Sequence, residues 1–435
     1  MTYKTLLIII AVFLLAGLGV GFFIFKERPV ETVRVTETAP EGFFPASSED
    51  ARVPARDSQG QSQGGAFSLE KPSTGSDQTR KALSLRQFVA VPVSGATILE
   101  HKDDIVVRYI ERESGHVLEM ALNEKVPTKV TNTTLPKTTE VLWGPKGETL
   151  IIRALDGPEN RLETVFAQVV KPKQATSTDE TRRLTFGEVV PLAVGSLEGA
   201  LLPSTIRAVT ASPSRDKIFF LLETADGVSG VVSDFIRADT AHGQLPVYSS
   251  PFRDWHTQWA SANSIALTTK PASGVPGYLY LLNTTSKSQE KLLDAVPGLT
   301  ALVSPKGNLV IYARAQGSGF TTFILDKTSR ESVAFPLQTL PEKCVFSVDE
   351  KTVFCSVPDT VLPGLYPDHW YQGVTSWNDA LWEVDINTGE ATRLVSASDF
   401  RLSQTLDAVD LQLSTDGRLL LLRNKRDSTL WVLEM

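Results

Sequence analysis

Short runs of hydrophobic and polar residues alternate along the chain after residue 85, and no long amphipathic helical pattern occurs there. A unit recurs in which an apolar stretch, a turn rich in Ser, Pro, Gly or Asp, and four to six β-forming residues follow one another. Clear copies are Leu142–Ile152, Ala211–Phe220, Val303–Tyr312 and Leu413–Leu422. Each copy predicts two antiparallel strands around a tight polar turn.

The copies, with three degenerate ones, recur at intervals typical of a β-propeller. Their second turn residues are His101, Pro145, Pro213, Ala262, Pro305, Val348 and Thr415. Most of the spacings match one four-stranded blade, roughly 40–50 residues, and two are longer. We therefore predict an all-β fold, a seven-bladed β-propeller at 85–435. The last blade lacks an outer strand, and the β-run at 85–93 is free to supply it and close the ring.

Two short motifs give the repeats a family resemblance. Ser-Pro-Lys-Gly occurs at 304–307, and Asp-x-x-Thr-Gly begins at Asp385. This pattern resembles the TolB-type, WD40-like propeller repeats of bacterial envelope proteins, and the resemblance implies the fold rather than an activity. No blade ends in a Trp-Asp pair, so the chain is not a true WD40 protein.

The N-terminal region has a different character. Residues 6–25 contain no charged or strongly polar side chain, and about 30 Å of helix would span a bilayer. Because no A-x-A cleavage pattern follows, we predict an uncleaved transmembrane α-helix. A short charged N-terminus followed by a long soluble domain is the usual layout of an exported, anchored protein, so we predict that the C-terminal domain lies outside the cytoplasm. Residues 29–84, rich in Pro, Gly, Ser and Gln, predict a disordered linker. The predicted location is a membrane crossed once.

Charge and composition exclude several function classes. The 435-residue chain has a formal net charge of −7 and no basic run, so we expect no nucleic-acid partner. It has two cysteines and five histidines, none spaced like metal ligands. No metal site and no cofactor are expected.

The two cysteines flank one repeat turn. With the turn at Asp349 and Glu350, strand pairing places Cys344 opposite Cys355, near the separation that a disulfide needs. Two small buried thiols are the alternative. A disulfide would independently indicate a compartment outside the cytoplasm.

The candidate functional surface is the insertion at about 358–380, where the blade-six repeat is long. Connections between the second and third strands of a blade emerge on the same face as connections between blades. The candidate residues are Tyr366, His369, Trp370, Tyr371 and Trp377 of the insertion, with Trp255 and His256 in the connection to blade four. Such aromatic side chains are enriched where proteins bind partners. The alternative is that the loop packs on itself as a plug.

These features favour a membrane-anchored binding module of the cell envelope, with a protein or glycan partner and without catalysis. No catalytic residue is assigned. The alternative function is an enzyme, a lyase or glycan-active hydrolase, at the propeller mouth. For it the sequence offers one group of acid–base residues, Asp254, His256, Asp368 and His369.

Overall fold

The structure is a computed structural model that describes residues 83–100, 104–171, 194–238, 243–396 and 405–435. The predicted transmembrane segment 6–25, and all but the end of the predicted linker 29–84, lie outside these residues. Across the described ranges, no helix has both the length and the apolar character needed to cross a membrane. This finding contradicts the predicted single-pass membrane location, which we correct here.

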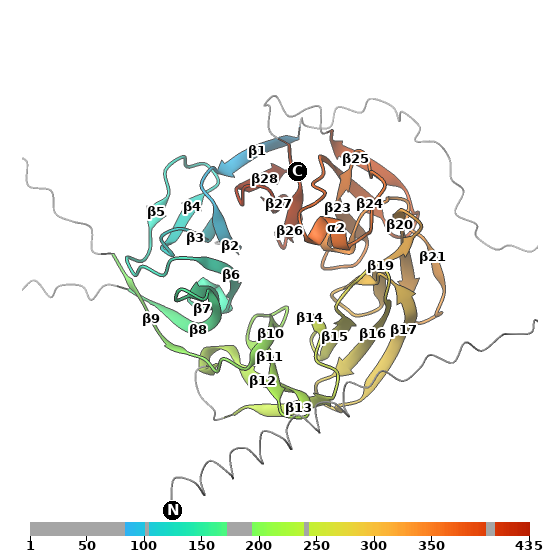
Figure 1. Cartoon of the computed structure of the whole chain (residues 1–435). Coiled ribbons are helices and arrows are strands. Elements are labelled where there is room, and N and C mark those ends of the chain that lie inside the picture. The colour runs from blue at the N-terminus through green and yellow to red at the C-terminus, as the bar shows by residue number, and fades with distance from the viewer. Residues whose placement is uncertain (1–82, 101–103, 172–193, 239–242, 397–404) are drawn as a thin grey trace, which may run out of the picture. The chain divides into compact units, whose positions relative to one another are not determined.

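The described residues form seven four-stranded antiparallel sheets around a central axis (Figure 1). The first strand of each blade lies innermost, and the fourth lies at the rim. Blades one to three comprise β2 (Val93–Glu100), β3 (Ile105–Glu111), β4 (Val117–Ala121), β5 (Thr128–Lys129); β6 (Thr138–Trp143), β7 (Thr149–Asp156), β8 (Arg161–Val170), β9 (Ser196–Leu201); and β10 (Ile206–Ala211), β11 (Lys217–Thr224), β12 (Gly227–Asp234), β13 (Leu245–Ser250).

The remaining four blades complete the ring, and in the described part of the chain four short helices lie in connections. Blades four to seven comprise β14 (Trp255–Ser261), β15 (Ser264–Thr269), β16 (Pro276–Asn283), β17 (Gln289–Pro297); β18 (Thr300–Val303), β19 (Leu309–Gln316), β20 (Gly319–Asp326), β21 (Ser332–Ala334); β22 (Cys344–Phe346), β23 (Thr352–Pro358), β24 (Asp379–Asp385), β25 (Ala391–Val395); and β26 (Ala408–Leu413), β27 (Leu419–Asn424), β28 (Leu430–Glu434), β1 (Ser84–Val89). The helices are η1 (Pro145–Gly147), η2 (Phe235–Arg237), η3 (Pro341–Lys343) and α2 (Asp368–Tyr371).

The predicted all-β, seven-bladed propeller is therefore confirmed. All seven repeat turns connect the first and second strands of a blade. A serine hydroxyl stabilises four of these turns by accepting a hydrogen bond from the backbone N–H five residues later, at 2.9–3.0 Å. The four serines are Ser212, Ser304, Ser347 and Ser414. This bond explains why serine recurs at that position of the repeat.

The first strand of the domain closes the ring, as the sequence predicts. β1 pairs antiparallel with β28, so that Ser84 lies opposite Glu434 and Leu85 opposite Leu433. Phe88 and Val89 are buried in a cluster that also includes Leu430 and Val432. The pairing of β1 with β28 thus gives the edge backbone groups of β28 hydrogen-bond partners, and it also buries apolar surface.

Candidate functional site

The blade-six insertion lies between β23 and β24 and carries the short helix α2, close to β26 on the inner side of the ring (Figure 1). Hydrogen bonds attach it to the second-to-third connections of three other blades. Asp368 Oδ2 accepts bonds from the backbone N–H and hydroxyl of Ser273 in blade four, at 2.9 and 2.6 Å. The Gly364 N–H donates to Ser318 O in blade five, and Lys425 Nζ in blade seven donates to Trp370 O. These connections therefore meet on one face.

Three of the candidate aromatic residues form the base of the insertion. Tyr366, Trp370 and Trp377 are 1–3% exposed. The Trp377 ring stacks on both others, with ring centroids 5.6 Å from Tyr366 and 5.5 Å from Trp370. They pack with Phe320, Leu340 and further apolar residues of blades five and seven. Their present role is therefore packing.

The other candidates differ in exposure. Trp255 is buried against Tyr248, Phe252 and Tyr280 at the junction of blades three and four, and its Nε1–H donates to Phe252 O. His256, the next residue of β14, is exposed, His369 is half-buried, and Tyr371 is 41% exposed.

A buried charge cluster lies directly beneath the aromatic base. Lys343 Nζ donates to Asp407 Oδ1 at 2.6 Å and to Ala408 O at 3.0 Å, and lies 2.8 Å from Asp379 Oδ2. All three charged side chains are 0% exposed. The ammonium also lies 5.2 and 5.3 Å from the ring centroids of Trp370 and Trp377, within cation–π distance.

The two carboxylates of this cluster differ in their surroundings. Burial raises the pKa of Asp379, whose Oδ2 accepts bonds from the Ser356 hydroxyl and the Ala408 N–H. Burial also acts to raise the pKa of Asp407, but the Lys343 charge and hydrogen bonds, including one from Trp370 Nε1, outweigh it and hold the pKa below its usual value.

Next to Lys343 in the sequence, Glu342 of η3 forms a polar pair with Tyr371 of α2. The Tyr371 hydroxyl donates to Glu342 Oε1. Burial raises the pKa of Glu342, and it also raises the pKa of Tyr371 well above its usual value, assisted by the Glu342 charge. The charge of His256 acts in the opposite direction on Glu342. Glu342 Oε2 is buried, and no described residue hydrogen-bonds to it.

The acid–base group offered by the sequence does not assemble. Asp254 lies 3.5 Å from Arg207 Nη2 and 3.6 Å from Lys270 Nζ, while Asp368 accepts its bonds from Ser273. His369 Nδ1 accepts a bond from the Leu365 N–H at 3.3 Å. Glu342 is the carboxylate that the structure adds, and the sequence carries no motif that would single it out. Among the described residues, no three His, Cys, Asp or Glu side chains are placed to hold a metal ion.

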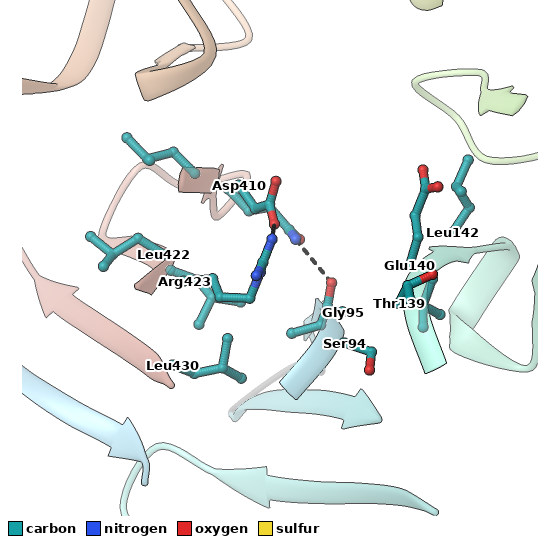
Figure 2. A pocket seen from close by; sticks show the side chains of 14 residues that line it. Ser94, Gly95, Thr139, Glu140, Leu142, Asp410, Leu422, Arg423 and Leu430 are labelled. Atoms are coloured by element: carbon teal, nitrogen blue, oxygen red, sulfur yellow. Dashed lines mark hydrogen bonds and ion pairs between the residues drawn. The ribbon is translucent and has the colours of Figure 1, made fainter. Parts of the chain in front are cut away.

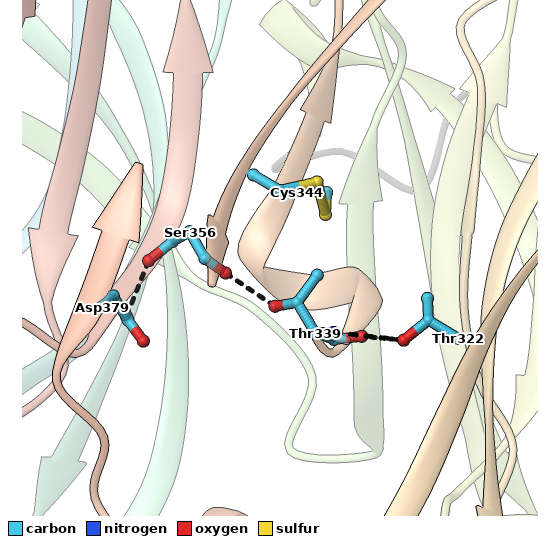
Figure 3. The surroundings of a disulfide bond; sticks show 6 residues. Thr322, Thr339, Cys344, Ser356 and Asp379 are labelled. Atoms are coloured by element: carbon cyan, nitrogen blue, oxygen red, sulfur yellow. Dashed lines mark hydrogen bonds between the residues drawn. A yellow bond between two sulfur atoms is a disulfide. The ribbon is translucent and has the colours of Figure 1, made fainter. Parts of the chain in front are cut away.

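The predicted disulfide is confirmed. Cys344 and Cys355 are paired across β22 and β23, with Cα atoms 4.1 Å apart. Figure 3 shows a relay of hydrogen bonds beside it. The Thr322 hydroxyl donates to Thr339 O, the Thr339 hydroxyl to Ser356 O, and the Ser356 hydroxyl to Asp379, each at 2.6 Å. The relay joins blade five to the buried charge cluster.

This topology defines the class of the protein as a seven-bladed β-propeller. No family model matches the chain, and no curated protein matches it. Among solved structures it is similar to a Mycobacterium tuberculosis puromycin-hydrolysing peptidase (10% identity, TM-score 0.46, covering 77% of this chain), of whose length the chain covers 52%. It is also similar to an oligogalacturonate lyase in complex with manganese (10%, 0.45, 79% of this chain and 97% of that one) and to TolB from Acinetobacter baumannii (12%, 0.38, 78% and 79%). The propeller fold that the TolB-type resemblance implied is shown by the strand topology itself.

These likenesses correct one prediction. We predicted that the chain is not an enzyme, but propellers similar to it include a lyase and a peptidase. The prediction is wrong to the extent that it relied on the fold, because this fold occurs in catalytic and non-catalytic proteins alike. At these identities the likenesses concern the fold alone, and activity has to be argued from the site.

Proposed function

We propose that the propeller binds a protein partner through the outer surface of the blade-six insertion. The observation that carries this proposal is the way the insertion divides its apolar side chains. The Trp370 and Trp377 rings lie against the charge cluster, while Leu362, Leu365, Tyr371 and Val374 stay 41–67% exposed. Leaving four large hydrophobic residues of one short segment in water is unfavourable unless a partner covers them.

Rigidity supports the same proposal. The insertion is attached to three other blades, and its helix rests on a buried ion cluster. A surface held in one conformation loses little conformational entropy when it binds. Exposed aliphatic side chains favour a protein segment over a glycan, because sugars offer hydroxyl groups that leucine and valine cannot satisfy.

Site-specific photo-crosslinking in the producing cell tests the proposal. A benzophenone amino acid replaces Val374, and in a matched control it replaces Val348, which is about equally exposed but lies in the β22–β23 turn. We expect one protein to crosslink from Val374, and to be lost when Leu362→Ser and Leu365→Ser are added. Equal crosslinking from Val348, or glycan as the crosslinked material, contradicts the proposal.

Acid–base catalysis at the mouth is a second candidate function, favoured by Glu342. A carboxyl whose pKa is raised by burial, with a phenol beside it and a free oxygen, is a common arrangement for general acid catalysis. Incubation with mixed oligosaccharides, followed by assay of new reducing ends, tests it. Turnover by the wild type that Glu342→Gln abolishes supports this function, and turnover unaffected by Glu342→Gln argues against it.

A further inference from the structure

A cavity of about 580 Å³ is lined by strands of blades seven, one and two, and none of the residues that line it belongs to the blade-six insertion. Figure 2 shows side chains from β2, β6, β26 and β27 around it. Its lining includes Glu140, Leu142, Asp410, Gln412 and Arg423.

Both acidic side chains of this lining carry their own counterion. Arg423 Nε donates to Asp410 Oδ2 at 2.7 Å, and the two side chains point toward each other in Figure 2. Glu140 Oε2 accepts a bond from Arg153 Nη1 at 3.2 Å. Because these charges are already neutralised, a ligand that carries a net charge would find no matching counter-charge here.

A β-bulge aims Asp410 into the cavity. In the pairing of β26 with β27, Val409 lies opposite Arg423 and Gln412 opposite Leu421, so Asp410 and Leu411 together face Leu422. Asp410 adopts a left-handed conformation with φ of 54°. Bulges that redirect a side chain, and residues held in such backbone conformations, concentrate at functional sites.

Hydrogen-bonding capacity remains unused around this bulge. Among the described residues, none bonds to Asp410 Oδ1 or accepts a bond from Arg423 Nη1. Gln412 Nε2 donates to Ala96 O at 2.9 Å, while its Oε1 is buried and has no hydrogen-bond partner among the described residues. The cavity thus offers acceptors and a donor, and its apolar lining includes the half-buried side chain of Leu142.

We propose that this cavity binds a neutral, polyhydroxylated ring, such as a sugar or a cyclitol. One hydroxyl donates to the free oxygen of Asp410, and its neighbour on the ring accepts from Arg423. A vicinal diol matches such a carboxylate–guanidinium pair, since hydroxyl groups both donate and accept. The less polar face of the ring packs on Leu142. The proposal is independent of the partner surface on blade six.

Saturation-transfer NMR on the full chain tests the proposal with D-glucose, D-galactose, N-acetyl-D-glucosamine and myo-inositol as probes. We expect transfer to at least one of them, and weaker binding of D-glucuronate than of D-glucose. Absence of transfer to all four probes overturns the proposal, and so does tighter binding of the charged D-glucuronate.

Variants locate the binding. Asp410→Asn keeps a residue that tolerates the left-handed backbone but removes the charge, and we expect affinity to fall roughly tenfold or more, as for the loss of a charged hydrogen bond. Arg423→Gln, a second variant, should weaken binding similarly. The control Asp294→Asn changes an exposed aspartate paired with Lys291 and should bind like the wild type. Undiminished binding by both cavity variants refutes the assignment of the site.

Discussion

Replacing Lys343 by methionine tests how the blade-six insertion is held in place. Methionine keeps most of the length and the apolar stem of lysine, so packing against Trp370 and Trp377 is largely retained. The substitution removes the ammonium that lies 2.6 Å from Asp407 and 2.8 Å from Asp379. Both carboxylates are fully buried and cannot recruit bulk water as a replacement.

The expected cost follows from that burial. Removing one partner of a buried ion pair leaves uncompensated charge and typically costs about 3–5 kcal/mol of unfolding free energy. Hydrogen bonds to Asp407 from Trp370, Ser376 and Trp377 remain, so we expect the lower part of this range. Even about 3 kcal/mol changes the ratio of folded to unfolded protein by roughly a hundredfold.

The cost should also depend on pH. Burial already raises the folded-state pKa of Asp379 above the unfolded value of 3.8, and removing the opposing Lys343 charge raises that pKa further. The folded variant then binds more protons than the unfolded chain, so its stability falls as pH rises from 3.8 through the raised pKa. The destabilisation relative to the wild type is therefore larger at about pH 8 than at about pH 5.

Urea unfolding, followed by tryptophan fluorescence, measures these effects because Trp370 and Trp377 lie on the cluster. The matched control is Lys425→Met, whose partly exposed ammonium also lies 5.0 Å from the Trp370 ring centroid but neutralises no fully buried carboxylate at hydrogen-bond distance. We expect it to cost about 1 kcal/mol or less, and Lys343→Met with Asp379→Asn to recover part of the loss. A Lys343→Met loss below about 1 kcal/mol, or equal at both pH values, would refute this reasoning.

Three further predictions concern other parts of the domain. Replacing Cys344 and Cys355 by alanine should lower the unfolding free energy by roughly 3 kcal/mol, because the bond closes a loop of sequence separation 11; a urea midpoint equal to that of the oxidised wild type contradicts this. A hydrogen bond from the Ser414 hydroxyl holds the pKa of Asp416 at about 2, so the stability that the Asp416 carboxylate contributes is lost as pH falls from 3.8 toward 2. Asp416→Asn should therefore flatten the pH dependence of the unfolding midpoint in this range. Gly95→Ala should lower the unfolding free energy by roughly 1–3 kcal/mol, because the new Cβ lies 2.8 Å from Val141 Cβ in the first strand of blade two. The control Gly274→Ala, whose Cβ meets open space, should lower the thermal unfolding midpoint clearly less.

The fold could be predicted from the sequence because its determinants are local and repeated. Four of the seven repeat turns carry a serine that bonds to its own hairpin. Third strands end in Asp or Asn side chains that accept bonds from the following turn, as at Asn283, Asp326 and Asp385. Ring closure by the first strand followed from counting strands. The disulfide followed from hairpin register alone, since Cys344 and Cys355 pair directly.

The candidate site was predicted less completely because its contacts are distant in sequence. Lys343 meets Asp407 across 64 positions, and Asp368 meets Ser273 across 95. No local sequence pattern predicts contacts between residues so far apart in the chain. The insertion and its aromatic content were apparent, but Glu342 has no motif and gains its raised pKa only from the side chains that the fold places around it.

The buried charges also explain why the aromatic content of the insertion did not reveal its outer surface. Trp370 donates a hydrogen bond to Asp407, and both Trp370 and Trp377 present their faces to the Lys343 ammonium. Indole rings satisfy a buried ion cluster in a way that aliphatic side chains cannot, because they supply an N–H donor and a π-face. The cluster therefore draws the tryptophans inward, and leucine and valine residues, with Tyr371, remain to form the exposed surface. In such a loop the aromatic residues indicate where the support lies, and the aliphatic residues indicate where a partner binds.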